Sequence, residues 1–251
     1  MTVGCVVLLL AKNHYFIPVV HWGIYLIIII GLYTFAVVLG CIKISLSFFL
    51  PVYCNAKTQE KVVALSFDDG PDDKYTPLIL EILKKYNVPA TFFCIGKHIK
   101  GNEQLIKRMH DEGHAIGNHS YTHNFWFDVY STKSMLAEMK YTDDDIKAII
   151  GQKPLLFRPP YGVTNPNLSK AIKIGGYSPI GWSIRSMDTI AKNERKLLEG
   201  ITEKINPGDI ILLHDNISIT ASILSSLIEK IQQRGYRIIR LDKMLKLEVY
   251  V

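Results

Sequence analysis

Four short polar fragments carry the residue types of a hydrolytic metal site. They are SFDDG at 66–70, HSYTH at 119–123, RPPYG at 158–162 and LLHD at 212–215. Together they supply two adjacent carboxylates, two histidines four residues apart, one arginine and one late histidine. No local structure can unite fragments so far apart in the sequence, so a common site depends on the tertiary fold.

Asp68 and Asp69 directly follow an apolar run, KVVALSF at 61–67. Asp, Gly and Pro also form turns for backbone reasons, so the DDGP sequence by itself is compatible with a simple turn. At the end of a buried strand, however, two carboxylates repel each other unless a cation or an arginine neutralises them. One of them can then bind a metal ion while its neighbour acts as a base.

His119 and His123 stand at positions i and i+4, where one helical turn would place both imidazoles on the same face. Neutral imidazoles are good ligands for zinc and similar divalent metals. The HxxxH spacing alone is common, and a structural pair is the alternative. Joined to one carboxylate, the two histidines would leave coordination positions for water and substrate.

Arg158 closes an apolar run just before two prolines. It could form a surface salt bridge, but a buried guanidinium that faces the aspartates would orient one carboxylate. The rigid turn that follows could aim the Tyr161 amide at a developing oxyanion. His214 follows the run IILL and is expected at the same edge, with a core histidine as the alternative.

The rest of the chain alternates between two kinds of segment, which predicts a parallel sheet, open or closed into a barrel. Strands are expected at 61–67, 90–95, 114–118, 155–158, 177–183, 209–213 and 237–240. Helices are expected at 76–86, 102–112, 132–150, 167–174, 194–205 and 221–233. The polar fragments then follow strand ends, where functional side chains gather in parallel barrels. Asp188 lies just after the fifth strand.

The N-terminal part is of another kind, because residues 13–42 contain no Lys, Arg, Asp or Glu. About 20 apolar residues suffice for a transmembrane helix, so this stretch predicts one span. Residues 1–11 are apolar but too short to cross alone, and they lack the basic start of a signal peptide. We therefore expect a membrane segment at 1–41, a connector at 42–60 and a globular domain at 61–251.

The net charge of +6 does not indicate a nucleic-acid partner, because the basic residues are scattered and no nucleic-acid-binding module is recognisable. The four cysteines show no CxxC spacing and suggest no disulfide framework. We expect no nucleic acid and predict no protein partner.

In this order, the four fragments resemble those of carbohydrate esterase family four, the polysaccharide deacetylases with a NodB-homology domain. The resemblance covers about residues 61–245. It implies a distorted (β/α) barrel, in agreement with the alternation of strands and helices. It also implies that Asp69, His119 and His123 hold a divalent metal, commonly zinc, with cobalt or another divalent ion as alternatives.

The resemblance assigns roles to the other residues as well. It implies that Asp68 is the general base, oriented by Arg158, and that His214 is the general acid, paired with Asp188. The amide of Tyr161 would help to stabilise the oxyanion. The acetyl-methyl pocket would be walled by Leu212 and Trp182.

The implied activity is metal-dependent removal of N-acetyl groups from an envelope polysaccharide, such as peptidoglycan or a chitin-like polymer, with release of acetate. An O-acetyl esterase acting on a glycan such as xylan and a catalytically silent, membrane-anchored glycan-binding protein remain open. Because the family's substrates lie outside the cytoplasm, we expect the domain to face the periplasm or the cell surface.

The chain departs from the family at one motif. Many members carry a DxxDW pattern, where this chain reads RSMDT at 185–189. Asp188 matches the acidic partner of the late histidine, whereas Arg185 replaces an acid and Thr189 replaces the tryptophan. We expect a more open pocket with an additional positive charge beside it.

Overall fold

The computed structural model describes residues 19–251, which divide into two compact units after Leu39. Helix α2 (Val19–Ile42) has no acidic residue in its first turn and no basic residue in its last. Within the described part of the chain, its segment Trp22–Ile42 is the one stretch that is long and apolar enough to cross a membrane. The expectation for residues 1–11 falls outside the described residues.

The second unit is built on a parallel sheet, as predicted. The strand order is β5-β4-β3-β2-β1-β7-β6, with β8 paired to β1. The strands are β1 (Val62–Asp68), β2 (Thr91–Cys94), β3 (Ala115–Asn118), β4 (Leu156–Phe157), β5 (Ser178–Pro179), β6 (Ile184–Arg185), β7 (Ile210–His214) and β8 (Arg237–Ile238).

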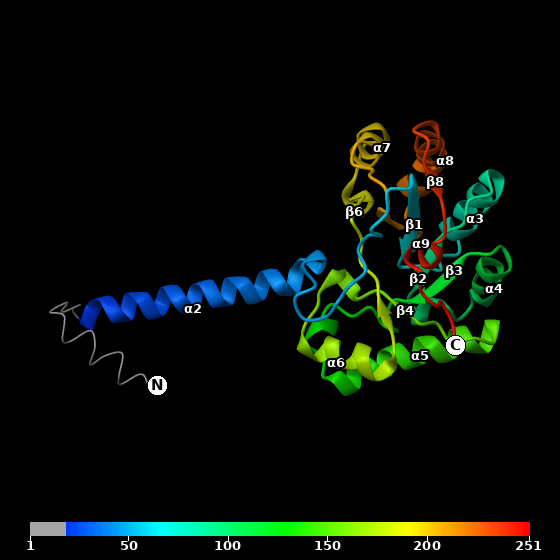
Figure 1. Cartoon of the computed structure of the whole chain (residues 1–251). Coiled ribbons are helices and arrows are strands. Elements are labelled where there is room, and N and C mark those ends of the chain that lie inside the picture. Colours follow the sequence, from blue (N-terminus) through cyan, green and yellow to red (C-terminus); the bar gives the residue numbers. More distant parts are fainter. Residues whose placement is uncertain (1–18) are drawn as a thin grey trace. The chain divides into compact units, whose positions relative to one another are not determined.

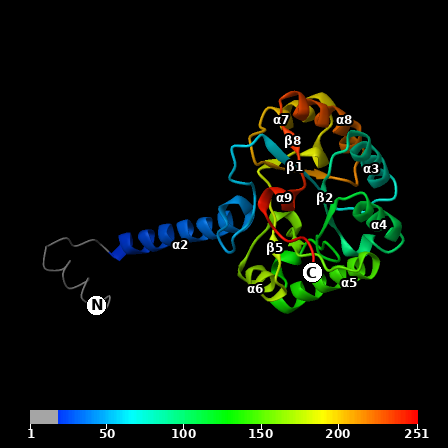
Figure 2. The same ribbon diagram turned by 45° about the vertical axis from the view of Figure 1, so that its right-hand side comes forward.

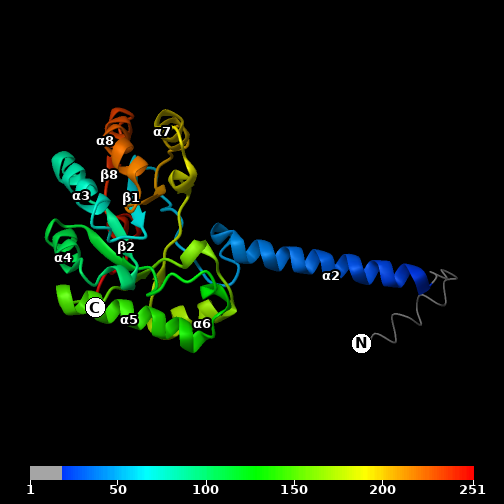
Figure 3. The same ribbon diagram turned by 180° about the vertical axis from the view of Figure 1, so that it is seen from behind.

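Helices surround this sheet, and Figure 2 shows α3 to α8 arranged around the strands. The helices are α3 (Tyr75–Tyr86), α4 (Glu103–Asp111), α5 (Thr132–Ile150), α6 (Pro166–Gly175), α7 (Glu194–Thr202), α8 (Ser218–Gln233) and α9 (Leu241–Leu245). Adjacent helices contact each other: α3 packs against α4 and α8 (Figure 3). Side-chain caps begin α5, α6 and α7 at Ser131, Asn165 and Asn193, as is typical of helix N-termini.

Strand β1 lies in the middle of the sheet (Figure 1), and all seven of its residues are buried. Its side chains alternate between two faces. Val63, Leu65 and Phe67 belong to the core between sheet and helices. Val62 and Ala64 belong to a second core inside the curved sheet. By the same alternation Ser66 and Asp68 lie on the inner face, which explains how a carboxylate enters the interior.

The strand predicted over residues 177–183 is wrong in its extent. Only β5, at residues 178–179, forms within this range, and β6 begins just after it; the two short strands lie at opposite edges of the sheet. The intervening backbone turns away from the sheet ladder because other groups use its carbonyls: Arg158 donates to Ile180 O and Gly181 O. Gly181 is also pressed against Cys54, whose Sγ would lie 2.6 Å from an added Cβ.

The segment expected as an extended connector, 42–60, is packed onto the domain. It begins with a short 3-10 helix, Ile44–Leu46, and then forms single bridges from Tyr53 to Ile180 and from Asn55 to Asp209. Ile44 and Leu50 are buried. The bridges lie between the β5 edge and the start of β7, so this segment occupies part of the gap that an open sheet leaves.

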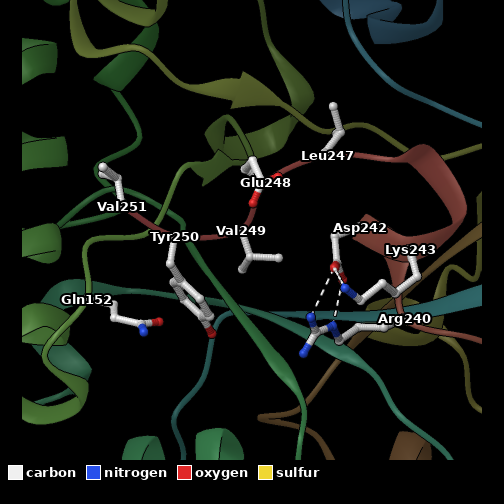
Figure 4. Close-up of a pocket in the computed structure, with 9 residues that line it drawn as sticks. All are labelled: Gln152, Arg240, Asp242, Lys243, Leu247, Glu248, Val249, Tyr250 and Val251. Atoms are coloured by element: carbon white, nitrogen blue, oxygen red, sulfur yellow. Dashed lines mark hydrogen bonds and ion pairs between the residues drawn. The ribbon is translucent and has the colours of Figure 1, made fainter.

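The C-terminal segment covers the amino ends of the strands. Val249 and Val251 exchange backbone hydrogen bonds with 153–155, and the Tyr250 hydroxyl accepts from Ile116 N at 2.9 Å. A cavity of about 350 Å³ lies along this segment, beside the paired side chains of Arg240 and Asp242 (Figure 4). None of the predicted catalytic residues lines it.

Candidate metal and catalytic site

The predicted site residues meet at the carboxyl ends of the strands. Asp68 ends β1, His119 follows β3, Arg158 follows β4 and His214 ends β7. They surround a cavity of about 220 Å³. Its lining is Asp68, Asp69, His119, His123, Pro159, Tyr161, Gly162, Trp182, Arg185, Thr189, Leu212 and His214. Two predicted residues, Arg158 and Asp188, lie behind this lining and hold members of it.

Asp69, His119 and His123 form a compact set of potential metal ligands. The Nε2 atoms of His119 and His123 lie 3.6 Å and 3.7 Å from Asp69 Oδ1. One ligand atom from each residue lies within 4.8 Å of the other two. This spacing leaves room between the three atoms for a cation that contacts all of them.

The two histidines do not share a helical turn, so that part of the prediction is wrong. His119 directly follows β3, and residues 119–124 form an irregular loop with a bend at 121–122. Ser120 and His123 have left-handed backbone angles, with φ of 62° and 49°. The loop is held by the Glu138 carboxylate of α5, which accepts from the Thr122 amide at 2.7 Å and from its hydroxyl at 2.9 Å.

His119 is held in its neutral form. Its Nδ1 lies 2.7 Å from the Arg158 carbonyl, which can only accept, so Nδ1 carries the proton and Nε2 presents a lone pair. Burial lowers the pKa of His119 to about 3. Burial also lowers the pKa of His123. Two neutral imidazoles beside a carboxylate fit a divalent cation such as zinc.

Asp68 forms a hydrogen-bonded ion pair with a buried arginine, Arg158. Arg158 Nη1 donates to Asp68 Oδ1 at 2.6 Å and to Ser66 Oγ at 2.9 Å, while its guanidinium stacks on Phe93 at 4.1 Å. Burial raises the pKa of Asp68, and the charge of Arg158 only partly opposes this effect. Because Arg158 binds Oδ1 of Asp68, the other oxygen, Oδ2, faces the potential metal ligands and lies 3.7 Å from His119 Nε2.

His214 is paired with Asp188 on the other side of the cavity. Its Nδ1 lies 2.8 Å from Asp188 Oδ1, and its amide donates to Oδ2 at 2.8 Å. Burial acts to lower the pKa of His214, but the hydrogen bond and charge of Asp188 raise it overall. Burial acts to raise the pKa of Asp188, but its bonds to His214, Thr220 and Ser186 lower it overall.

Three supporting residues escaped the sequence reasoning. Ser66 bridges Arg158 to Ile211 O, Glu138 holds the histidine loop, and Thr220 donates to Asp188 Oδ2 at 2.7 Å. Ser66 offered the clearest signal, as a lone hydroxyl in an apolar strand. Glu138 and Thr220 carry no signal, because helical segments often contain such residues.

The remaining predicted residues form the cavity wall. Tyr161 has a left-handed backbone, with φ of 58°, and its ring lies 4.6 Å from that of His123. Gly162 faces Trp182, whose ring would lie 2.4 Å from an added Cβ. Trp182 and Leu212 both line the cavity, together with the two departures from the family motif, Arg185 and Thr189.

A parallel α/β fold with this set of groups at its strand ends defines a class of hydrolase, and the donor set Asp69, His119 and His123 can hold a divalent metal. The family described as polysaccharide deacetylase matches residues 55–180. The chain belongs to the polysaccharide deacetylase family.

Characterised relatives are similar over most of the domain. A peptidoglycan-N-acetylglucosamine deacetylase of Bacillus cereus is 34% identical over 195 residues, which cover 74% of this chain and 89% of that protein. A peptidoglycan-N-acetylmuramic acid deacetylase of Bacillus subtilis is 34% identical over 192 residues, covering 75% of this chain and 73% of that protein. The Bc1960 peptidoglycan N-acetylglucosamine deacetylase structure superposes with a TM-score of 0.73 at 29% identity, covering 78% of this chain and 92% of that one.

Proposed function

We propose that this chain is a divalent-metal-dependent hydrolase that removes N-acetyl groups from an envelope polysaccharide and releases acetate. One observation carries the proposal. Three side chains that can ligate a metal share one cavity with a carboxylate held by Arg158 and an imidazole held by Asp188. The similarity to two peptidoglycan deacetylases supports peptidoglycan as the polymer.

Asp69, His119 and His123 would hold the cation, with zinc as the ion that this donor set commonly takes. When bound, such a cation makes water more acidic and polarises a carbonyl oxygen. In the proposed mechanism Asp68 accepts a proton through Oδ2, because Arg158 occupies Oδ1. The oxygen of the attacking water forms a bond to the acetyl carbon, and the carbonyl π electrons move onto the carbonyl oxygen.

The backbone N–H of Tyr161 would donate to the developing oxyanion. Asp188 holds Nδ1 of His214, so Nε2 carries the proton that the leaving nitrogen takes. The carbon–nitrogen bond breaks as this proton arrives. Acetate and a free amino sugar are the products. Trp182 and Leu212 supply apolar surface for the acetyl methyl group.

We further propose that helix α2 anchors the enzyme in a membrane, with residues 61–251 as the deacetylase domain outside the cytoplasm, in the periplasm or at the cell surface. The apolar segment Trp22–Ile42 and the cell-wall substrates named for the relatives support this placement. Protease treatment of intact cells would test it: an external domain is digested, whereas a cytoplasmic domain is protected.

Acetate release by the full chain tests the activity. We expect release from N-acetylglucosamine oligomers or peptidoglycan, loss of release with a chelator, and recovery with zinc or cobalt. Asp68→Asn should lower kcat about 10²- to 10⁴-fold, the contribution of a general base, with its metal content unchanged. Release only from O-acetylated xylan would indicate an esterase, and glycan binding without any acetate release would indicate a silent protein.

A further inference from the structure

A second cavity adjoins the catalytic one. It measures about 530 Å³ and is lined by Ile42, Lys43, Ile44, Ser45, Cys54, Asn55, Trp182, Ser183 and Arg185. We call it the basic cavity, because Lys43 and Arg185 are its charged residues and none of its lining residues is acidic. Trp182 and Arg185 also line the catalytic cavity, so the two spaces share a wall.

Neither cation of the basic cavity has a carboxylate within 4.0 Å among the residues that the structure describes. Arg185 differs in this respect from Arg158, whose guanidinium forms an ion pair with Asp68 at 2.6 Å. Both Lys43 and Arg185 are exposed. The guanidinium of Arg185 lies 5.9 Å from the centre of the Trp182 ring, which favours a position between the two cavities.

In the catalytic cavity, the carboxylates of Asp68 and Asp69 would be neutralised by Arg158 and by the metal ion that the site is proposed to hold. Lys43 and Arg185 have no such carboxylate partner among the residues that the structure describes. An anionic substituent near the reacting sugar is therefore favoured on the Arg185 side. A guanidinium is well suited to this task because its planar fork matches a carboxylate.

We propose that Lys43 and Arg185 form a subsite for carboxylates that a glycan carries next to the acetamido group being cleaved. The subsite rests on the proposed function and would give the enzyme a preference for acidic glycans over neutral chitin-like chains. A peptidoglycan strand offers such carboxylates from two sources: the lactyl group of muramic acid residues that carry no peptide, and the free carboxylates of the peptide where one is attached.

Three substrates distinguish these sources: a neutral N-acetylglucosamine oligomer, peptide-free peptidoglycan strands, and strands that retain their peptides. The readout is the ratio of kcat/KM for each acidic substrate to that for the neutral one, measured with the full, metal-loaded chain. We expect Arg185→Gln to lower this ratio about threefold and the double variant with Lys43→Gln to lower it about tenfold, mainly through KM. High salt should lower the ratio of the wild type more than that of the double variant.

Lys170→Gln is the matched control, because Lys170 is exposed and lines neither cavity. It should leave the ratio unchanged. A fall for peptide-free strands assigns the lactyl carboxylate, and a fall only for peptide-bearing strands assigns the peptide. An unchanged ratio in the double variant, or an equal loss with all three substrates, would overturn the subsite.

Binding separates failure of the subsite from failure of the proposed function. The affinity of the same strands is measured in an Asp68→Asn background by titration calorimetry. Weaker binding in the double variant, with no acetate released by any form of the chain, would retain the subsite and reject the deacetylase. Acetate release together with binding that is unaffected by Lys43 and Arg185 would retain the deacetylase and reject the subsite.

Discussion

Two adjacent aspartates occupy very different surroundings. Asp68 is buried at the end of β1, and Arg158 binds one of its oxygens, while Asp69 has a φ of 78° and turns toward the two histidines. Because the backbone conformation changes between them, the two neighbouring carboxylates point in different directions and contact different partners. At the scale of single residues, the site thus depends on buried side chains that orient each functional group through hydrogen bonds, as Arg158 does for Asp68.

The pairing of Arg158 with Asp68 predicts a large stability cost for Arg158→Met. Removing one member of a buried ion pair leaves an uncompensated charge, so we expect the free energy of unfolding to fall by about 3–5 kcal/mol. Arg237→Met is the control, since Arg237 pairs with Glu60 at 3.1 Å where both side chains are exposed. It should cost less than about 1 kcal/mol. Equal costs in urea denaturation would contradict the buried pairing.

The pair formed by His214 and Asp188 predicts the alkaline limb of the pH–rate profile. The pKa of His214 is raised in the folded protein, so its protonated form persists below that pKa and is lost as pH rises through it. Asp188→Asn removes the supporting charge. We therefore expect the alkaline limb of kcat/KM to move to lower pH.

Thr220→Val is the comparison for this profile, because it removes one hydrogen bond to Asp188 and keeps the charge. It should move the alkaline limb less than Asp188→Asn does. A limb that stays in place in Asp188→Asn would show that His214 is not the group that sets it.

At the scale of elements, the histidine loop is positioned by a helix that contributes no ligand. Glu138 of α5 accepts three hydrogen bonds from Tyr121 and Thr122, between the two histidines. We expect Glu138→Ala to weaken zinc affinity about 10- to 100-fold, the usual effect of removing a residue that orients metal ligands. Chelator competition measures it.

The matched control for Glu138 is Asp144→Ala on the same helix. Asp144 pairs with Lys140 at 2.6 Å on the exposed face, away from the loop. It should leave the zinc affinity unchanged. If both variants lose affinity equally, α5 acts through its general stability and not through the hydrogen bonds of Glu138.

At the scale of the whole molecule, the segment between α2 and β1 belongs to the folded domain. The Thr164 amide donates to Cys41 O at 2.9 Å, and residues 53–56 bond to both the β5 edge and Gly208. A chain that begins at Lys57 loses these bonds and the buried side chains of Ile44 and Leu50. We expect it to be about 3–6 kcal/mol less stable than a chain that begins at Gly40.

Urea denaturation of the two shortened chains measures this difference. Equal midpoints would mean that the segment contributes nothing to the fold.

Local sequence patterns were enough to predict the parallel strands and the order of the polar fragments. The reason is physical: a buried parallel strand such as β1 is largely apolar. Its polar residue before the strand end, Ser66, is satisfied by hydrogen bonds to Ile211 O and Arg158. Strand ends of a parallel sheet meet at one edge, so the sequence predicts that Asp68, His119 and His214 lie close together.

Local sequence patterns did not predict the backbone correctly outside the helices and strands. A spacing of four suggested a helical turn for His119 and His123, but hydrogen bonds to Glu138 hold them on a bend. The alternation of strand and helix segments suggested one strand over 177–183, but Arg158 and Tyr53 bind that backbone from other parts of the chain. Such partners lie far away in sequence and leave no local pattern.

The sequence by itself therefore determined the fold class and the family, and it predicted which polar residues meet at one edge of the sheet, because these depend on residue types at strand ends. The tertiary structure alone decided how the groups are held: Arg158 on one oxygen of Asp68, Asp188 on one nitrogen of His214, and Arg185 in the wall between two cavities. Each of these depends on distances and burial between separate strands, which only the packed chain fixes.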